Sequence, residues 1–215
     1  MDREIKHEHI FFKSGDITLE GVLSYPQKSS SCSGVVICHP HPLYGGDMNN
    51  NVVAGIKGAL QSEGFVVLRF NFRGVTLSEG KYDEGKGEVD DVIAAVNFLS
   101  SRAKVDQDRL FLVGYSFGAW VGLRAVLTIN ALRAVAGIAP PCGVYDFNFL
   151  HDSSLPILLV GGDHDTFCKK KELEIIFDKI SSPKKKVILL QSDHFFSGTE
   201  GEVGEEVKRF FSLCL

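Results

Sequence analysis

The chain has 215 residues, of which 44% are hydrophobic and 23% charged, and these values exclude a disordered or collagen-like protein. The net charge is −4, from 27 acidic and 23 basic side chains, so no basic excess is present to neutralise a nucleic-acid backbone. A chain of this length buries about 70% of its unfolded surface without disulfides or metals. We therefore expect one domain over residues 1–215 and no nucleic-acid partner.

The sequence carries no signal for export or membrane insertion. Residues 1–7 are polar and mixed in charge, and they lack the apolar core of a signal peptide. The uncharged stretch at 110–123 is shorter than the ~20 residues that a spanning helix needs. The cysteines are five in number and form no C-x-x-C pair, which argues against a disulfide framework and a zinc site. These features favour a cytoplasmic protein with free thiols and no membrane partner.

The predicted elements alternate along most of the chain. The runs at 10–12 and 17–19 flank a Ser14-Gly15-Asp16 turn and predict an antiparallel hairpin. Short apolar runs then predict strands buried on both faces, at 35–38, 66–70, 110–113, 134–138, 157–160 and 187–190. Helical patterns lie between or after them, at 51–63, 88–101, 117–129, 170–180 and 202–213. This order predicts a doubly wound, mostly parallel α/β sheet with helices on both faces.

Ligands of such sheets bind at the carboxyl ends of the strands, so the residues that follow each strand carry the functional signal. The strand at 110–113 runs into Gly114-Tyr115-Ser116-Phe117-Gly118 and then into a helix. A serine in a strand-turn-helix context projects its hydroxyl out of the sheet, and the helix N-terminus favours negative charge beside it. Ser116 is therefore the candidate nucleophile, with a capping serine in an ordinary turn as the alternative.

A serine nucleophile needs a base and an orienting carboxylate. Among the seven histidines, His194 is the best candidate base, because it follows the last predicted strand directly. Two acids, Asp163 and Asp165, follow the strand at 157–160 and compete for the orienting role.

An oxyanion hole requires two backbone N–H groups. Phe117, directly after the nucleophile, would supply one of them. The other should come from the loop at 39–46, where His41 has the only N–H between two prolines, and Leu43 is the alternative. The pair His39 and His41 has no third ligand motif, so we expect no metal and no cofactor.

Several motifs together resemble the small, cap-less serine hydrolases of the α/β-hydrolase superfamily, over roughly residues 8–213. They are His39-Pro-His-Pro-Leu-Tyr-Gly-Gly46, Arg69-Phe-Asn-Phe-Arg-Gly74, Gly114-Tyr-Ser-Phe-Gly118, Ala139-Pro-Pro141 with Tyr145-Asp146-Phe147, and Asp193-His194-Phe195. The chain order Ser, Asp, His is also that of the superfamily. The resemblance implies Asp165 as the triad acid and supports His41 as the oxyanion donor. Thr76 departs from the pattern, since such proteins often carry a glycine there.

Too few residues separate Ala139 from Ile157 for a helical cap. We therefore expect an open site bordered by the loop at 141–150, with Tyr145 and Phe147 binding substrate. The expected activity is hydrolysis of carboxylic esters with small or medium acyl groups, through an acyl-enzyme intermediate. A thioesterase, an amide hydrolase and a catalytically silent interaction protein are the alternatives, and the sequence does not indicate an oligomeric state.

Overall fold

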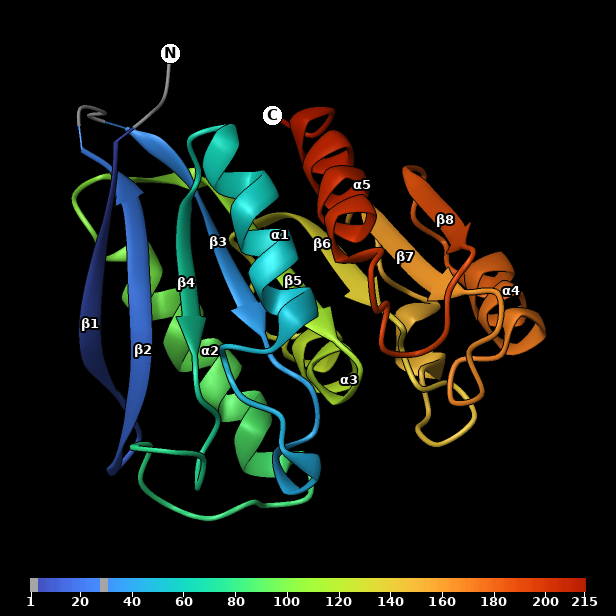
Figure 1. Ribbon diagram of the computed structural model, residues 1–215, viewed down its shortest axis with the longest axis horizontal. Coiled ribbons are helices and arrows are strands. Elements are labelled where there is room, and N and C mark those ends of the chain that lie inside the picture. The colour runs from blue at the N-terminus through green and yellow to red at the C-terminus, as the bar shows by residue number, and fades with distance from the viewer. Residues whose placement is uncertain (1–3, 28–30) are drawn as a thin grey trace.

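The computed structural model describes residues 4–27 and 31–215, and an eight-stranded sheet runs through them (Figure 1). The strands are β1 (Ile5–Ser14), β2 (Ile17–Pro26), β3 (Cys32–Cys38), β4 (Val66–Phe70), β5 (Val105–Tyr115), β6 (Leu132–Ile138), β7 (Ile157–Gly162) and β8 (Lys185–Leu190). The helices are α1 (Asn51–Ser62), α2 (Lys86–Ser100), α3 (Phe117–Ala125), α4 (Lys170–Lys179) and α5 (Glu200–Ser212), with short 3₁₀ turns η1 (Pro42–Tyr44) and η2 (Asn148–Leu150).

The sheet order is β1-β2-β4-β3-β5-β6-β7-β8. β1 and β2 form the predicted antiparallel hairpin, β2 also pairs antiparallel with β4, and every later pair is parallel. The prediction of a mostly parallel, doubly wound sheet is confirmed. Strands β3, β4 and β7 are buried along their whole length, which explains their unbroken apolar runs.

Helices cover both faces of the sheet (Figure 1). α1 and α5 lie together on one face, where a Cβ on Gly55 or Gly204 would collide with the backbone of the partner helix. α2 and α3 lie on the other face. α3 ends at Ala125, four residues before the predicted end, and residues 126–128 form a hydrogen-bonded turn at its end. None of the helices in residues 4–27 and 31–215 is long and apolar enough to cross a bilayer.

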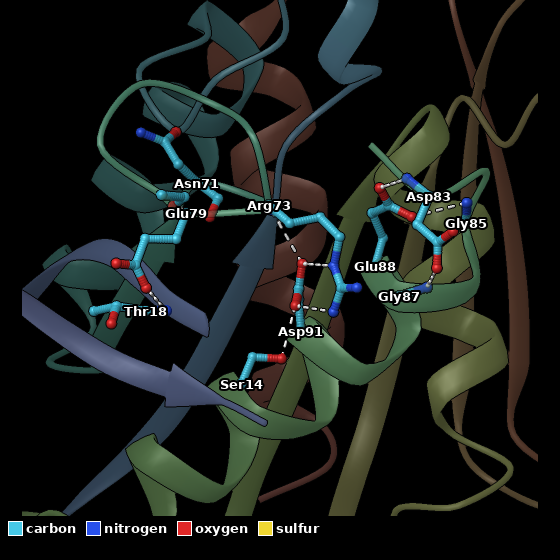
Figure 2. Close-up of polar contacts among 11 residues, drawn as sticks. Ser14, Thr18, Asn71, Arg73, Glu79, Asp83, Gly85, Gly87, Glu88 and Asp91 are labelled. Carbon is cyan, nitrogen blue, oxygen red and sulfur yellow. Dashed lines mark hydrogen bonds and ion pairs between the residues drawn. The ribbon is translucent and has the colours of Figure 1, made fainter. Parts of the chain in front are cut away.

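The connector between β4 and α2 is fixed by two buried carboxylates (Figure 2). Asp91 accepts hydrogen bonds from the Ser14 hydroxyl at 2.7 Å and from the Arg73 guanidinium at 2.8 and 3.0 Å. Glu88 accepts from the N–H groups of Asp83 and Gly85, both at 2.8 Å. These bonds hold the connector against the first turn of α2.

Thr76 lies in the same connector and has φ of 51°, in the left-handed region that favours glycine. The glycine that the resemblance leads one to expect there would adopt this backbone without strain.

Replacing Asp91 with alanine should lower the free energy of unfolding by about 3 kcal/mol or more, since it leaves the Arg73 guanidinium without its carboxylate. Equilibrium urea unfolding measures this change, and Asp90→Ala is the matched control because Asp90 is exposed on the same helix. Equal stability of the two variants would contradict a stabilising role for the buried ion pair.

Candidate active site

Ser116 occupies the sharp turn between β5 and α3. Its backbone has φ of 54° and ψ of −119°, a strained conformation for a residue with a side chain. The Ser116 N–H donates to the Ile138 carbonyl at 2.8 Å, which holds the turn against β6. A Cβ on Gly114 would collide with the Gly118 carbonyl, and one on Gly118 with the His39 carbonyl. Both flanking glycines are therefore required by close backbone approach.

The structure brings Ser116, His194 and Asp165 together in one hydrogen-bonded chain. Ser116 Oγ lies 2.9 Å from His194 Nε2, and His194 Nδ1 lies 2.7 Å from Asp165 Oδ2. The Asp165 side chain is fully buried, and its other oxygen accepts from the N–H groups of Phe167 at 2.7 Å and Cys168 at 2.8 Å. This geometry allows the imidazole to take a proton from the serine while the carboxylate fixes its tautomer.

Asp163, the competing acid, points elsewhere. Its Oδ1 lies 2.7 Å from His164 Nδ1 and accepts from the Ser192 N–H at 3.0 Å. Asp163 therefore joins the loop after β7 to the loop after β8, and it does not contact His194.

Tyr115 positions the loop that carries His194, a contact that sequence reasoning missed. The Tyr115 hydroxyl donates to the His194 carbonyl at 2.9 Å, and its ring lies 5.9 Å from the imidazole. Its place directly before Ser116 at the end of β5 was the available signal. Burial raises the pKa of Tyr115, so its hydroxyl stays protonated as the donor.

The backbone N–H groups of His41 and Phe117 have no hydrogen-bond partner within residues 4–27 and 31–215, and both residues line one pocket. The Leu43 N–H, the alternative donor, instead donates to His41 Nδ1 at 3.2 Å. The structure therefore leaves the N–H of His41, and not that of Leu43, unpaired.

His39 has a purely structural position at the end of β3. Its Nε2 accepts from the Phe72 N–H at 3.0 Å, and its Nδ1 donates to the Pro40 carbonyl at 2.6 Å. Burial lowers the pKa of His39 to about 4, so the ring is neutral. Both ring nitrogens are occupied, and the described part of the chain holds no cluster of three or more metal-binding side chains.

A pocket of about 540 Å³ opens above Ser116 and His194. Tyr145 lines it and stacks on Trp120 with ring centroids 4.1 Å apart. Its further walls are mainly apolar and aromatic, from Pro40, Tyr44, Tyr115, Phe117, Pro141, Val144, Phe167 and Phe195.

The expected substrate contact at Phe147 is wrong. Phe147 is 1% exposed and belongs to the hydrophobic core, where its ring packs near Phe149. Two further aromatic walls that were not expected come from Phe167 and Phe195, which are 47% and 57% exposed. Phe195 directly follows His194, and Phe167 lies two residues after Asp165, which was the signal that could have found them.

Residues 139–156, between β6 and β7, contain η2 as their single helical element, so no cap covers the pocket. With this geometry in place, comparison with known proteins identifies the family. The PET hydrolase-like family matches residues 12–211. The chain belongs to this family.

Individual relatives are similar over most of the chain. The chain is 35% identical to an uncharacterised protein of Rickettsia prowazekii over 87% of this chain and 81% of the relative. It is similar to the structure of an alpha-beta serine hydrolase homologue from Coxiella burnetii, with a TM-score of 0.85, 34% identity and coverage of 94% and 96% of the two chains. It also resembles a serine hydrolase without a lid from Xanthomonas campestris, with a TM-score of 0.85, 28% identity and coverage of 98% and 95%. The protein is a cap-less serine hydrolase of the α/β-hydrolase superfamily.

Proposed function

We propose that this hydrolase cleaves carboxylic esters with small or medium acyl groups. The observation that carries the proposal is the hydrogen-bonded chain from Ser116 through His194 to the buried Asp165, at the floor of an open pocket. The same arrangement serves acyl transfer in many unrelated hydrolases.

In the proposed reaction, Ser116 Oγ attacks the ester carbonyl while His194 Nε2 takes the serine proton. The N–H groups of His41 and Phe117 stabilise the oxyanion of the tetrahedral intermediate. His194 then gives the proton to the leaving alcohol, and an acyl group remains on Ser116. Water attacks this acyl-enzyme by the same steps in reverse, and the carboxylic acid leaves. No metal or cofactor takes part in these steps.

The wall of the pocket favours an uncharged substrate. None of its lining residues is Asp, Glu, Lys or Arg, so no fixed charge of these side chains is present to pair with a charged acyl group. Tyr44 and Phe195 line the pocket and are 86% and 57% exposed, so the pocket is open to solvent. Neutral, partly apolar esters suit such a site better than charged ones.

The proposal is tested by labelling the purified protein with a fluorophosphonate probe and by assaying a matched panel of an ester, a thioester and an amide of the same acid. We expect labelling of Ser116 and the highest kcat/KM on the ester. Labelling with a preference for the thioester or the amide would replace the esterase assignment by one of those activities. An unlabelled protein that cleaves none of the three would support the catalytically silent alternative.

The acyl-chain preference on p-nitrophenyl esters should peak at short chains, of about two to six carbons. Each methylene buried in a pocket contributes about 0.8 kcal/mol, but carbons that extend past the open rim stay in water and contribute nothing. Measuring kcat/KM from acetate to palmitate checks this expectation. A maximum at laurate or palmitate would reveal a longer apolar groove and would contradict the short-chain assignment.

A further inference from the structure

We propose that the His41 side chain is a positioning residue for the oxyanion-binding N–H of its own backbone. It acts as the neutral tautomer with its proton on Nε2, and the Tyr82 oxygen accepts a hydrogen bond from that proton. The inference rests on the proposed function, because it concerns how one donor of the oxyanion hole is held. Neither role was visible in the sequence.

The Nδ1 side of the imidazole closes the turn that follows it. Nδ1 accepts from the Leu43 N–H at 3.2 Å and so caps η1. The His41 carbonyl accepts from the N–H groups of Tyr44 at 3.1 Å and Gly46 at 3.0 Å. Three N–H groups of the loop therefore point back to His41, and its own N–H is left for the pocket. An Nδ1 that accepts must carry no proton.

The Nε2 side is fixed by the connector before α2. The Tyr82 hydroxyl lies 3.3 Å from His41 Nε2. Because Nδ1 already accepts from the Leu43 N–H, the proton of the neutral ring is on Nε2, and the Tyr82 oxygen accepts a hydrogen bond from it. One tautomer therefore satisfies the contacts on both sides of the ring.

Ring packing ties His41 to the second oxyanion donor. The imidazole lies 4.8 Å from the Phe117 ring, 5.1 Å from the Tyr82 ring and 4.6 Å from the Tyr44 ring. A shift of the imidazole would therefore disturb the spacing between the N–H groups of His41 and Phe117. Oxyanion donors are effective only within a few tenths of an ångström of the correct position.

The residue that follows Tyr82 is anchored to the first turn of α2 (Figure 2). The next residue, Asp83, donates its N–H to the buried Glu88 and accepts at its side chain from the Gly87 N–H at 3.1 Å. The first turn of α2 therefore fixes the backbone beside Tyr82. This restrains the Tyr82 hydroxyl at its position next to His41 Nε2.

The arrangement predicts a second protonation that lowers activity. The titratable groups that face the His41 ring are Tyr82 from the connector, Tyr44 from η1 and the neutral His39 from the end of β3. No carboxylate within the described residues contacts the ring, and burial lowers the pKa of His41. Below that pKa, Nδ1 gains a proton and faces the Leu43 N–H as a second donor. The turn then loses its cap. This effect adds to the protonation of His194, which lowers the activity of any such triad.

The test compares four variants with the wild type on p-nitrophenyl acetate, over the full acid limb of the pH profile. His41→Ala removes the cap and should lower kcat about tenfold or more, with KM changed far less, because the lost contact acts on the transition state. His41→Asn keeps a side-chain acceptor for the Leu43 N–H but cannot titrate. It should therefore retain most of the kcat that His41→Ala loses. Tyr82→Phe should lower kcat by a smaller factor than His41→Ala.

The slope of the acid limb separates positioning from general structural support. In the wild type, log kcat should fall more steeply than one proton per pH unit, and in His41→Asn it should fall with a slope of one. Tyr44→Phe is the matched control for Tyr82→Phe, because it removes a hydroxyl beside the same ring without touching either nitrogen; it should keep the steep slope. A wild-type slope of one, or equal flattening by Tyr44→Phe, would overturn the proposal.

Two further readouts distinguish this inference from the proposed function. Nitrogen-15 NMR of the imidazole should show the His41 proton on Nε2 near neutral pH, and a proton on Nδ1 would overturn the proposal. Fluorophosphonate labelling reports on Ser116 directly. If the wild type is labelled and His41→Ala is labelled equally fast, the positioning role is wrong while the proposed function stands. If the wild type is not labelled at all, the proposed function fails and the inference fails with it.

Discussion

Replacing Ser116 with alanine is expected to lower kcat on a p-nitrophenyl ester about 10⁶-fold, the cost of losing a triad serine. The side chain of Ser116 makes one hydrogen bond, to His194 Nε2, and supplies the atom that would form the acyl bond. Without it, His194 and the N–H groups of the pocket have no nucleophile to assist. Steady-state kinetics on enzyme expressed without a native hydrolase background measures the loss.

The Ser116→Ala variant should still fold. Alanine keeps the Cβ of serine and lacks only the hydroxyl, so the substitution adds no strain to the turn at residue 116, where φ is 54°. Thermal unfolding and the circular dichroism spectrum should therefore match those of the wild type. Retention of more than a tenth of the activity by a folded variant would remove Ser116 from the nucleophile role.

Replacing Asp165 with asparagine is expected to lower kcat about 10⁴-fold. The Asp165 carboxylate accepts from His194 Nδ1 and from two backbone N–H groups, whereas an asparagine offers one acceptor oxygen for these three donors. The amide nitrogen would then face either the loop N–H groups or the imidazole. Facing the imidazole, it favours the tautomer with the proton on Nε2, which cannot take a proton from Ser116.

Asp163→Asn is the matched control, because Asp163 lies in the same loop and its substitution also replaces a carboxylate by an amide. Its contacts are to His164 and to the Ser192 N–H, away from the imidazole. We expect this variant to lose far less activity than Asp165→Asn. The opposite ranking would transfer the triad role to Asp163 and would mean that the loop after β7 rearranges in solution.

Sequence patterns were sufficient to predict the sheet, its mostly parallel direction and the edge of the sheet where the candidate catalytic residues lie. Unbroken apolar runs predict strands covered on both faces, and the residues directly after such strands must meet at one edge. Ser116 and His194 were selected as candidates in this way, because each lies within four residues of the end of a predicted strand. Local pattern was sufficient where a residue's position depends on its immediate neighbours in the chain.

Only the tertiary structure decided which of two nearby residues faces the site. Asp163 and Asp165 are two positions apart in one loop, and their directions depend on the contacts of Ser192 and His194 from another loop. Phe147 was expected in the pocket and lies in the core, directly before the short helix η2.

The contact between His41 and Tyr82 is another feature that local sequence pattern could not predict. The two side chains are 41 positions apart, and they meet because the carboxyl ends of β3 and β4 are neighbours in the sheet. The unpaired N–H of His41 likewise depends on where the Leu43 N–H is directed by the folded turn. The periodicity of a sequence encodes which face of an element is buried, whereas the partner of a single polar atom is set by loop geometry and by segments distant in the chain.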